Sequence, residues 1–293
     1  MASLKLNSHM IKNAFVLFIV NEKFRYHSRR TGALADKDNI EEFGCEMNFT
    51  INDISDIKLK DTSALKFDHK GHLLTHDLTA REMKNLFLTI STGDFSSYDA
   101  FICFISSYGE AGGISGVDGE TIPIQFIVDQ FIANDEYRTL VGKPKLFFTQ
   151  NCRGIDKGTF SVFHGDNEND IDAIADSGYN IPISMPLAAD ALVAYSSATG
   201  YESFRSKEMG SCFINKLTQV LRRHAHQMNL TDMLTIVNDE VDRMASVEGK
   251  EKQMPCFTSN LSKAVYFEVD LSEFNLSEVD LSELAASQKP TAL

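Results

Sequence analysis

The chain has 293 residues, 43% of them hydrophobic, and a formal net charge of −13 at pH 7. This length allows a large buried core, in one domain or two. The negative charge argues against nucleic acid and anionic membranes as the main partners, because both would repel the chain.

The cysteines and the N-terminal sequence indicate a cytoplasmic protein. The five cysteines are widely spaced and form no Cys-x-x-Cys pair, which favours reduced thiols over a disulfide framework. The N-terminus lacks the apolar core of a signal peptide, and the apolar run 14–20 is too short to span a bilayer. We therefore expect a cytoplasmic location and no membrane partner.

Apolar runs and amphipathic patterns alternate along the chain. Four runs predict buried parallel strands, at residues 14–20, 100–105, 145–149 and 190–195. Four amphipathic patterns predict helices, at residues 83–90, 124–131, 213–221 and 234–244. Thr79 and Glu82 form a capping box before the first of these helices. The alternation predicts an α/β fold with a mostly parallel central sheet.

Three other stretches lack strong apolar periodicity. Residues 52–72 are polar and mixed, which is typical of an insertion, and residues 155–180 are rich in Gly, Asp, Asn and Glu, which is typical of a mobile connector. The C-terminal tail is acidic and repeats the sequence Glu-Val-Asp-Leu-Ser-Glu. We expect this tail to be disordered or to dock as a short helix.

Two of the predicted strands end in segments that carry candidate chemistry. Residues 107–110, after the second strand, read Ser-Tyr-Gly-Glu, and residues 150–154, after the third, read Gln-Asn-Cys-Arg-Gly. The carboxyl ends of parallel strands meet at one edge of a sheet, so Tyr108 and Cys152 should lie near each other. A cysteine becomes an effective nucleophile when a neighbouring imidazole raises its thiolate fraction. A tyrosine is a poor base and never carries a positive charge.

These segments resemble the signature of the caspase family, Gln-Ala-Cys-Arg-Gly with a histidine about 50 residues earlier. Asn151 replaces the alanine, and Tyr108 stands where the family's Ser-His-Gly-Glu places its histidine. Three more segments resemble the family in the same order: residues 143–148, 195–201 and 254–257. The resemblance covers about residues 11–268. It implies a caspase-like three-layer α/β/α fold, in which helices flank a mostly parallel six-stranded sheet.

The resemblance also implies a pocket for a substrate aspartate. Caspases hold this carboxylate with two arginines and a glutamine, through charge-assisted hydrogen bonds. The implied substrate-binding residues are Arg30, Gln150, Ser203, Phe204 and Arg205. Gly109 and Cys152 would supply the backbone amides of the oxyanion hole, and Cys152 would also be the nucleophile. The alternative for each arginine is an ordinary solvated surface residue.

Six histidines are candidates to replace the missing general base, and none of the six is convincing. His164 lies in the connector, where no element positions it, and the histidines at 69, 72 and 76 lie in or beside the polar stretch 52–72. The spacing of these three fits no zinc motif. The histidines at 224 and 226 belong to a predicted helix and are expected at the surface. We therefore expect no metal and no cofactor.

The resemblance divides the chain into five regions: a short N-terminal segment (1–10), a large-subunit-like region (11–158), a connector (159–178), a small-subunit-like region (179–268) and an acidic tail (269–293). Asp170 and Asp176 are candidate cleavage sites, because the family separates its subunits after aspartates in such a connector. Residues 239–242 also spell a caspase target, Asp-Glu-Val-Asp, but they fall inside a predicted helix, and cleavage requires an extended substrate.

The leading interpretation is a catalytically impaired caspase homologue, or pseudo-caspase, because the nucleophile and the pocket are kept while the base is replaced. Such a protein would regulate an active caspase, and with it apoptosis, by dimerisation or decoy binding. Its expected partners are an active caspase paralogue or a second copy of itself, and aspartate-containing peptides. The alternatives are a low-activity cysteine endopeptidase that cleaves after aspartate, and a non-catalytic scaffold with a vestigial pocket.

Overall fold

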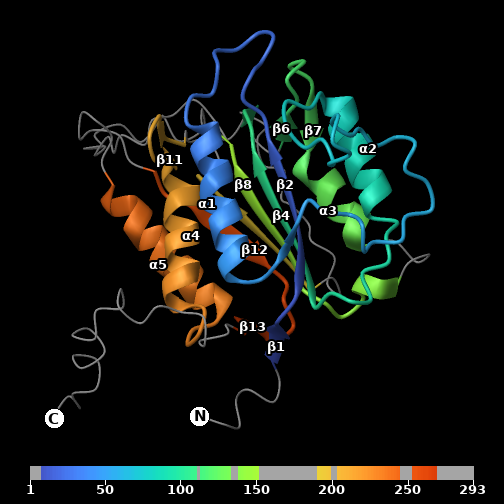
Figure 1. Cartoon of the computed structure of the whole chain (residues 1–293). Coiled ribbons are helices and arrows are strands. Elements are labelled where there is room, and N and C mark those ends of the chain that lie inside the picture. The colour runs from blue at the N-terminus through green and yellow to red at the C-terminus, as the bar shows by residue number, and fades with distance from the viewer. Residues whose placement is uncertain are drawn as a thin grey trace, which may run out of the picture.

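A six-stranded sheet forms the centre of the computed structural model (Figure 1), which describes residues 8–110, 113–132, 138–151, 190–198, 203–244 and 253–268. In spatial order the strands are β12 (Cys256–Ser259), β9 (Ala191–Tyr195), β8 (Lys145–Gln150), β4 (Ala100–Ser106), β2 (Ala14–Val20) and β3 (Thr50–Ile51). β12 runs antiparallel to β9, and all other neighbours in this sheet are parallel. The four predicted strands and the mostly parallel sheet are confirmed.

Helices cover both faces of this sheet (Figure 1). One face carries α1 (Ala33–Glu46), α4 (Cys212–His224) and α5 (Leu230–Arg243), and the other carries α2 (Ala80–Ile90) and α3 (Ile124–Ile132). Successive side chains of a strand point to opposite faces. In β2, Val16 and Phe18 therefore join the core under α1, whereas Phe15 and Leu17 join the core under α2. The predicted three-layer α/β/α arrangement is confirmed.

The sequence pattern did not predict α1, whereas the other four helices match predicted ones. The buried face of α1 includes Asp36 between Ala33 and Ile40, so a charged residue interrupts its apolar periodicity. The capping box of α2 forms as expected. Glu82 N donates to Thr79 Oγ1 at 3.3 Å, and Thr79 N donates to Glu82 Oε2 at 2.7 Å.

Short strands lie at the two ends of the sheet (Figure 1). At one end, β1 (Ser8–Ile11) pairs in parallel with β13 (Ala264–Phe267), and β1 crosses the expected boundary between residues 10 and 11. At the other end lie two antiparallel groups: β5 (Gly109–Glu110), β6 (Gly113–Ser115) and β7 (Thr121–Pro123), and then β10 (Arg205–Ser206) with β11 (Gly210–Ser211). A 3₁₀ turn spans Arg138–Leu140. Strands of two or three residues are too short to show a sequence period.

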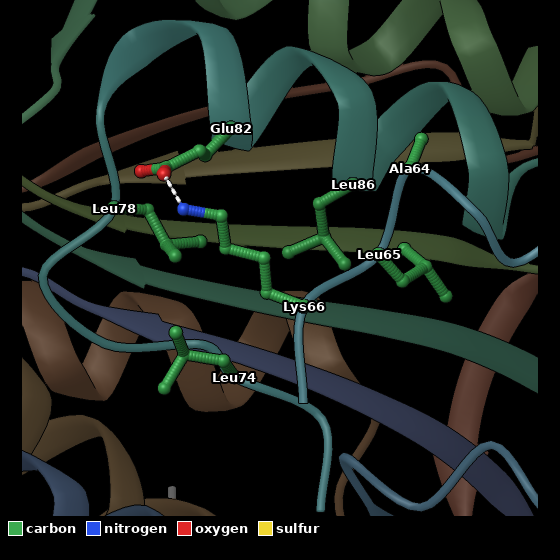
Figure 2. Close-up of a pocket in the computed structure, with 7 residues that line it drawn as sticks. All are labelled: Ala64, Leu65, Lys66, Leu74, Leu78, Glu82 and Leu86. Carbon is green, nitrogen blue, oxygen red and sulfur yellow. Dashed lines mark hydrogen bonds and ion pairs between the residues drawn. The ribbon is translucent and has the colours of Figure 1, made fainter. Parts of the chain in front are cut away.

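The polar stretch 52–72 packs beside α2. It contributes three residues to a small pocket (Figure 2), which is lined by Ala64, Leu65, Lys66, Leu74, Leu78, Glu82 and Leu86. An ion pair joins Lys66 to Glu82 at this pocket. Burial opposes ionisation of Glu82, but hydrogen bonds from Lys66 and Thr79 outweigh it and lower the pKa of Glu82 to about 2. The polar stretch 52–72 is thus held against α2 by charge as well as by apolar contact.

Other expectations have mixed outcomes. Residues 239–242 lie within α5, where Val241 is buried, as the helical pattern predicted. The connector with Asp170 and Asp176, and the acidic tail 269–293, lie outside the described residues. Within the described ranges, no helix has both the length and the apolar character that a membrane crossing requires.

Candidate active site

The ends of β4 and β8 form the candidate site. Ser107, just after β4, donates its backbone N–H to Gln150 O, at the end of β8, with an N···O distance of 3.0 Å. Tyr108 and Asn151 follow these two residues at the same edge of the sheet. The strand topology predicted this juxtaposition from sequence. Cys152, the expected nucleophile, lies outside the described residues.

Gly109 lies where a side chain has no room. A Cβ atom there would lie 2.4 Å from Gly113 O and 2.6 Å from Asn151 Nδ2. Ser115 N donates to Tyr108 O at 2.9 Å, and hydrogen-bonded pairs alternate with open pairs along an antiparallel ladder. The amide of Gly109 is consequently directed away from β6. This orientation suits an oxyanion-hole donor, because such an amide must have no partner in the ladder.

Arg30 is wholly buried at the carboxyl end of the sheet. Its Nη1 donates to Asn21 O at 2.9 Å, and its Nη2 donates to Ser106 Oγ at 3.1 Å. Its backbone N–H donates to Glu22 O at 2.9 Å. These contacts fix the guanidinium beside the ends of β2 and β4, and its burial excludes the solvated-surface alternative for this arginine.

A buried carboxylate that the sequence analysis missed supports Arg30. Asp36 accepts hydrogen bonds from Ser211 N and Ser211 Oγ, both at 2.6 Å, and from Ser106 Oγ at 2.8 Å. Ser106 therefore accepts a hydrogen bond from Arg30 and donates one to Asp36. Burial raises the pKa of Asp36, while these hydrogen bonds and the charge of Arg30 oppose the rise. A sequence signal exists: an aspartate on an otherwise apolar helix face requires buried partners.

Tyr108 contacts the two arginines of the expected pocket. Arg205 Nη2 donates to Tyr108 Oη at 3.1 Å, and the guanidinium carbon of Arg205 lies 5.3 Å from the centre of the Tyr108 ring. The guanidinium carbon of Arg30 lies 5.7 Å from the same centre. Both distances are within the range of cation–π attraction. The structure thus brings together Arg30, Tyr108 and Arg205, which are widely separated in sequence.

The loop after β2 surrounds the rest of the Tyr108 side chain. Tyr108 Oη donates to Ser28 O at 3.3 Å and lies 3.0 Å from Ser28 Oγ. The Phe24 ring meets the Tyr108 ring edge-on at 4.8 Å, and the His27 ring lies 5.1 Å from it. The sequence analysis did not consider His27, although its position shortly before Arg30 in the chain could have indicated its place near the site.

The remaining pocket residues form a second group of contacts. Gln150 is wholly buried, and its Nε2 donates to Ser203 Oγ at 2.9 Å. Phe204 N donates to Gln253 Oε1 at 2.7 Å, and Gln253 Nε2 donates to Ser196 O at 2.6 Å. Gln253, also missed from sequence, therefore fastens the segment that carries Ser203 and Phe204 to the end of β9.

Comparison with known proteins covers most of the chain. A family model described as "Caspase domain" matches residues 13–266. The chain belongs to the caspase family. Caspase-3 of Bos taurus is 37% identical to it over 204 residues, which make up 66% of this chain and 69% of that protein. Caspase-3 of Mesocricetus auratus is 36% identical over 225 residues (73% and 75%), and caspase-6 of Gallus gallus is 31% identical over 276 residues (87% and 81%).

Caspases are cysteine-type endopeptidases, so this chain is a homologue of proteolytic enzymes. The assignment of Tyr108 to the family's histidine position stays a prediction from the motif. The family and the fold expected from the sequence are confirmed. The roles of the pocket residues stay a prediction, which the convergence of Arg30 and Arg205 on Tyr108 supports. Among the residues that the structure describes, no three potential metal ligands gather at one place.

Proposed function

We propose that this caspase homologue is catalytically impaired and that it regulates an active caspase in apoptosis, by dimerisation or decoy binding. The observation that carries the proposal is that Tyr108, which the motif assigns to the histidine position, is hydrogen-bonded to Arg205 and Ser28. Its hydroxyl accepts from a guanidinium and donates to a backbone carbonyl. Neither Arg205 nor Ser28 is a base that could take the proton of the hydroxyl, so these contacts do not make Tyr108 a general base.

The chemistry of peptide hydrolysis explains why a tyrosine in place of the histidine should slow the reaction. An imidazole promotes the thiolate of the nucleophile and then returns a proton to the leaving amine. A phenol, with an ordinary pKa near 10, does neither at neutral pH. Loss of a general base costs roughly 10²–10⁴ in rate, and more where the catalytic residues act as a unit. The fold, in contrast, does not depend on the base.

The outer edge of β12 supports pairing with another caspase. Among the strands that the structure describes, β12 is the last of the central sheet and pairs with β9. Asn260 N donates to Ala191 O at 3.0 Å, so the alternation of an antiparallel ladder directs the amides of Phe257 and Ser259 away from β9. Met254, just before the strand, is 46% exposed. Outward amides and an exposed apolar side chain favour a second strand at this edge.

One observation favours a second candidate function, a low-activity endopeptidase that cleaves after aspartate. The exposed imidazole of His27 lies 5.1 Å from the Tyr108 ring, close to the expected position of a base. Slow proteolysis would follow if this imidazole reached the thiol of Cys152.

Turnover of an acetylated aspartyl peptide tests the proposal. We expect the wild type to be at least ~10²-fold slower than an effector caspase, because the general base is absent. Tyr108→His, with the connector cut near Asp176, should raise turnover, and Cys152→Ala should abolish the gain. A wild-type rate within tenfold of the effector caspase would refute impairment. Loss of residual wild-type turnover in His27→Ala would favour the endopeptidase instead.

A further inference from the structure

The Tyr108 side chain contacts both arginines of the expected aspartate pocket, whose ligand chemistry is definite. We propose that the Tyr108 side chain occupies the aspartate pocket itself, so that the chain excludes aspartyl peptides until this side chain moves. Tyr108 is then a specificity-determining residue and not only a lost base.

The positions of the two arginines carry this inference. A substrate carboxylate that bound both guanidiniums would need N···O contacts of roughly 2.7–2.9 Å with each. Instead, the guanidinium carbons of Arg205 and Arg30 lie 5.3 and 5.7 Å from the centre of one phenol ring. The phenol oxygen takes a hydrogen bond from Arg205, at 3.1 Å. The ring therefore lies within cation–π distance of both cations, and its oxygen takes a donor that a carboxylate would need.

The third pocket residue is also occupied by the chain. Gln150 Nε2, the donor that a carboxylate would use, donates to Ser203 Oγ at 2.9 Å. Gln150 Oε1 is buried and has no hydrogen-bond partner among the described residues. One of the two N–H groups of Nε2 is therefore already used by the chain, and a carboxylate could take only the other. Binding of aspartate to both arginines would also require Tyr108 to give up its bond to Arg205.

Contacts on its other sides hold the phenol in place. Phe24 and His27 flank the ring, and Ser28 bonds the hydroxyl through its backbone carbonyl and its own hydroxyl. Both cations nevertheless remain in the pocket, so removal of the phenol should restore an anion site. The inference rests on the proposed function only in treating the two arginines as the carboxylate pocket. A closed pocket suits a chain that regulates an active caspase by pairing at the β12 edge better than a chain that captures substrate peptides.

Equilibrium binding tests the inference. The probe is a fluorescein-labelled acetyl peptide that ends in aspartic acid, and all variants carry Cys152→Ala so that no covalent bond forms. We expect Tyr108→Ala to bind it at least tenfold more tightly than the Tyr108 parent. Tyr108→Phe should gain less, because the ring stays while its bond to Arg205 is lost. Tyr26→Ala, which removes a 77%-exposed tyrosine of the same loop, should leave the affinity unchanged.

Two results would overturn the inference. One is a Tyr108 parent that binds the peptide as tightly as Tyr108→Ala does. The other is a gain that survives Arg205→Gln in the Tyr108→Ala background, because the peptide would then bind elsewhere. If Tyr108→Ala fails to fold, Tyr108→Ser serves in the same comparison. Tight wild-type binding without turnover would refute occlusion alone, whereas gained binding with no effect on an active caspase would refute the regulatory proposal alone.

Discussion

The buried carboxylate of Asp36 should be essential for the stability of the site, and Asp36→Ala tests this. Asp36 is wholly buried and takes three hydrogen bonds, from Ser211 N, Ser211 Oγ and Ser106 Oγ, at 2.6, 2.6 and 2.8 Å. The alanine variant would leave these donors unpaired and the charge of Arg30 without its nearby carboxylate. A buried donor left without its acceptor costs about 1–3 kcal/mol. Three such donors therefore cost at least about 3 kcal/mol, against a total unfolding free energy of about 5–15 kcal/mol.

Urea denaturation, followed by circular dichroism, measures this loss. With a slope of about 3 kcal/mol per M, the expected loss lowers the midpoint by more than about 1 M. Asp38→Ala is the matched control, because Asp38 lies on the same helix but is exposed. Asp36→Asn, which keeps the volume and one acceptor, should lose less. A midpoint for Asp36→Ala within the range of the Asp38 control would refute the network as a source of stability.

The pH dependence of the same group has a definite sign. Burial raises the pKa of Asp36, so the native state binds its proton more tightly than the unfolded chain does. The contribution of this group to stability is therefore present below its ordinary pKa and is lost as the pH rises through its raised value. Asp36→Asn should remove that dependence, which the difference between wild-type and variant denaturation curves at several pH values would show.

Two further predictions concern the outer edge of β12 and the polar stretch 52–72. Ser259→Pro should abolish co-elution with an active caspase and any change in its turnover, because it removes an outward amide, while Ser259→Ala should do neither; equal effects of both variants would exclude this edge. Glu82→Gln should reduce the loss of stability at low pH. The pKa of Glu82 is lowered to about 2, so its carboxylate contributes stability that is present above pH 4.5 and is lost as the pH falls towards 2. The prediction is wrong if wild type and variant lose the same fraction of their urea midpoint between pH 7 and pH 3.

The sheet and most helices followed from local sequence, because their signals are strong. β2 and β4 are buried at every position, which produces a continuous apolar run, and α2 begins with a capping box. α1 was not predicted, because its buried face includes a charged residue whose partners lie on β4 and β11. A periodicity argument cannot anticipate partners that far away in the chain.

Part of the candidate site could likewise be predicted from the sequence, and part could not. Parallel strands fix which backbone segments meet, so the approach of Tyr108 to the segment before Cys152 was predictable. The direction of the Tyr108 side chain was not, because it depends on the loop after β2 and on Arg205 in β10, whose places only the folded chain defines. His27 lies in that loop and has no motif of its own, so its place shortly before Arg30 in the chain was its only sequence signal.

The pairing of β1 with β13 has a consequence for a cut chain. These strands come from opposite ends of the described sequence, and the halves on either side of residues 152–189 also meet where β8 pairs with β9 and where Asp36 binds Ser211. Scission of the backbone between residues 151 and 190 would break none of these three seams. While any one of these three contacts is intact, it keeps the partners of the other two at high effective concentration. The two halves therefore separate only if all three contacts break at the same time. A nicked molecule would thus remain a single particle, and its peptide bond would be dispensable for cohesion.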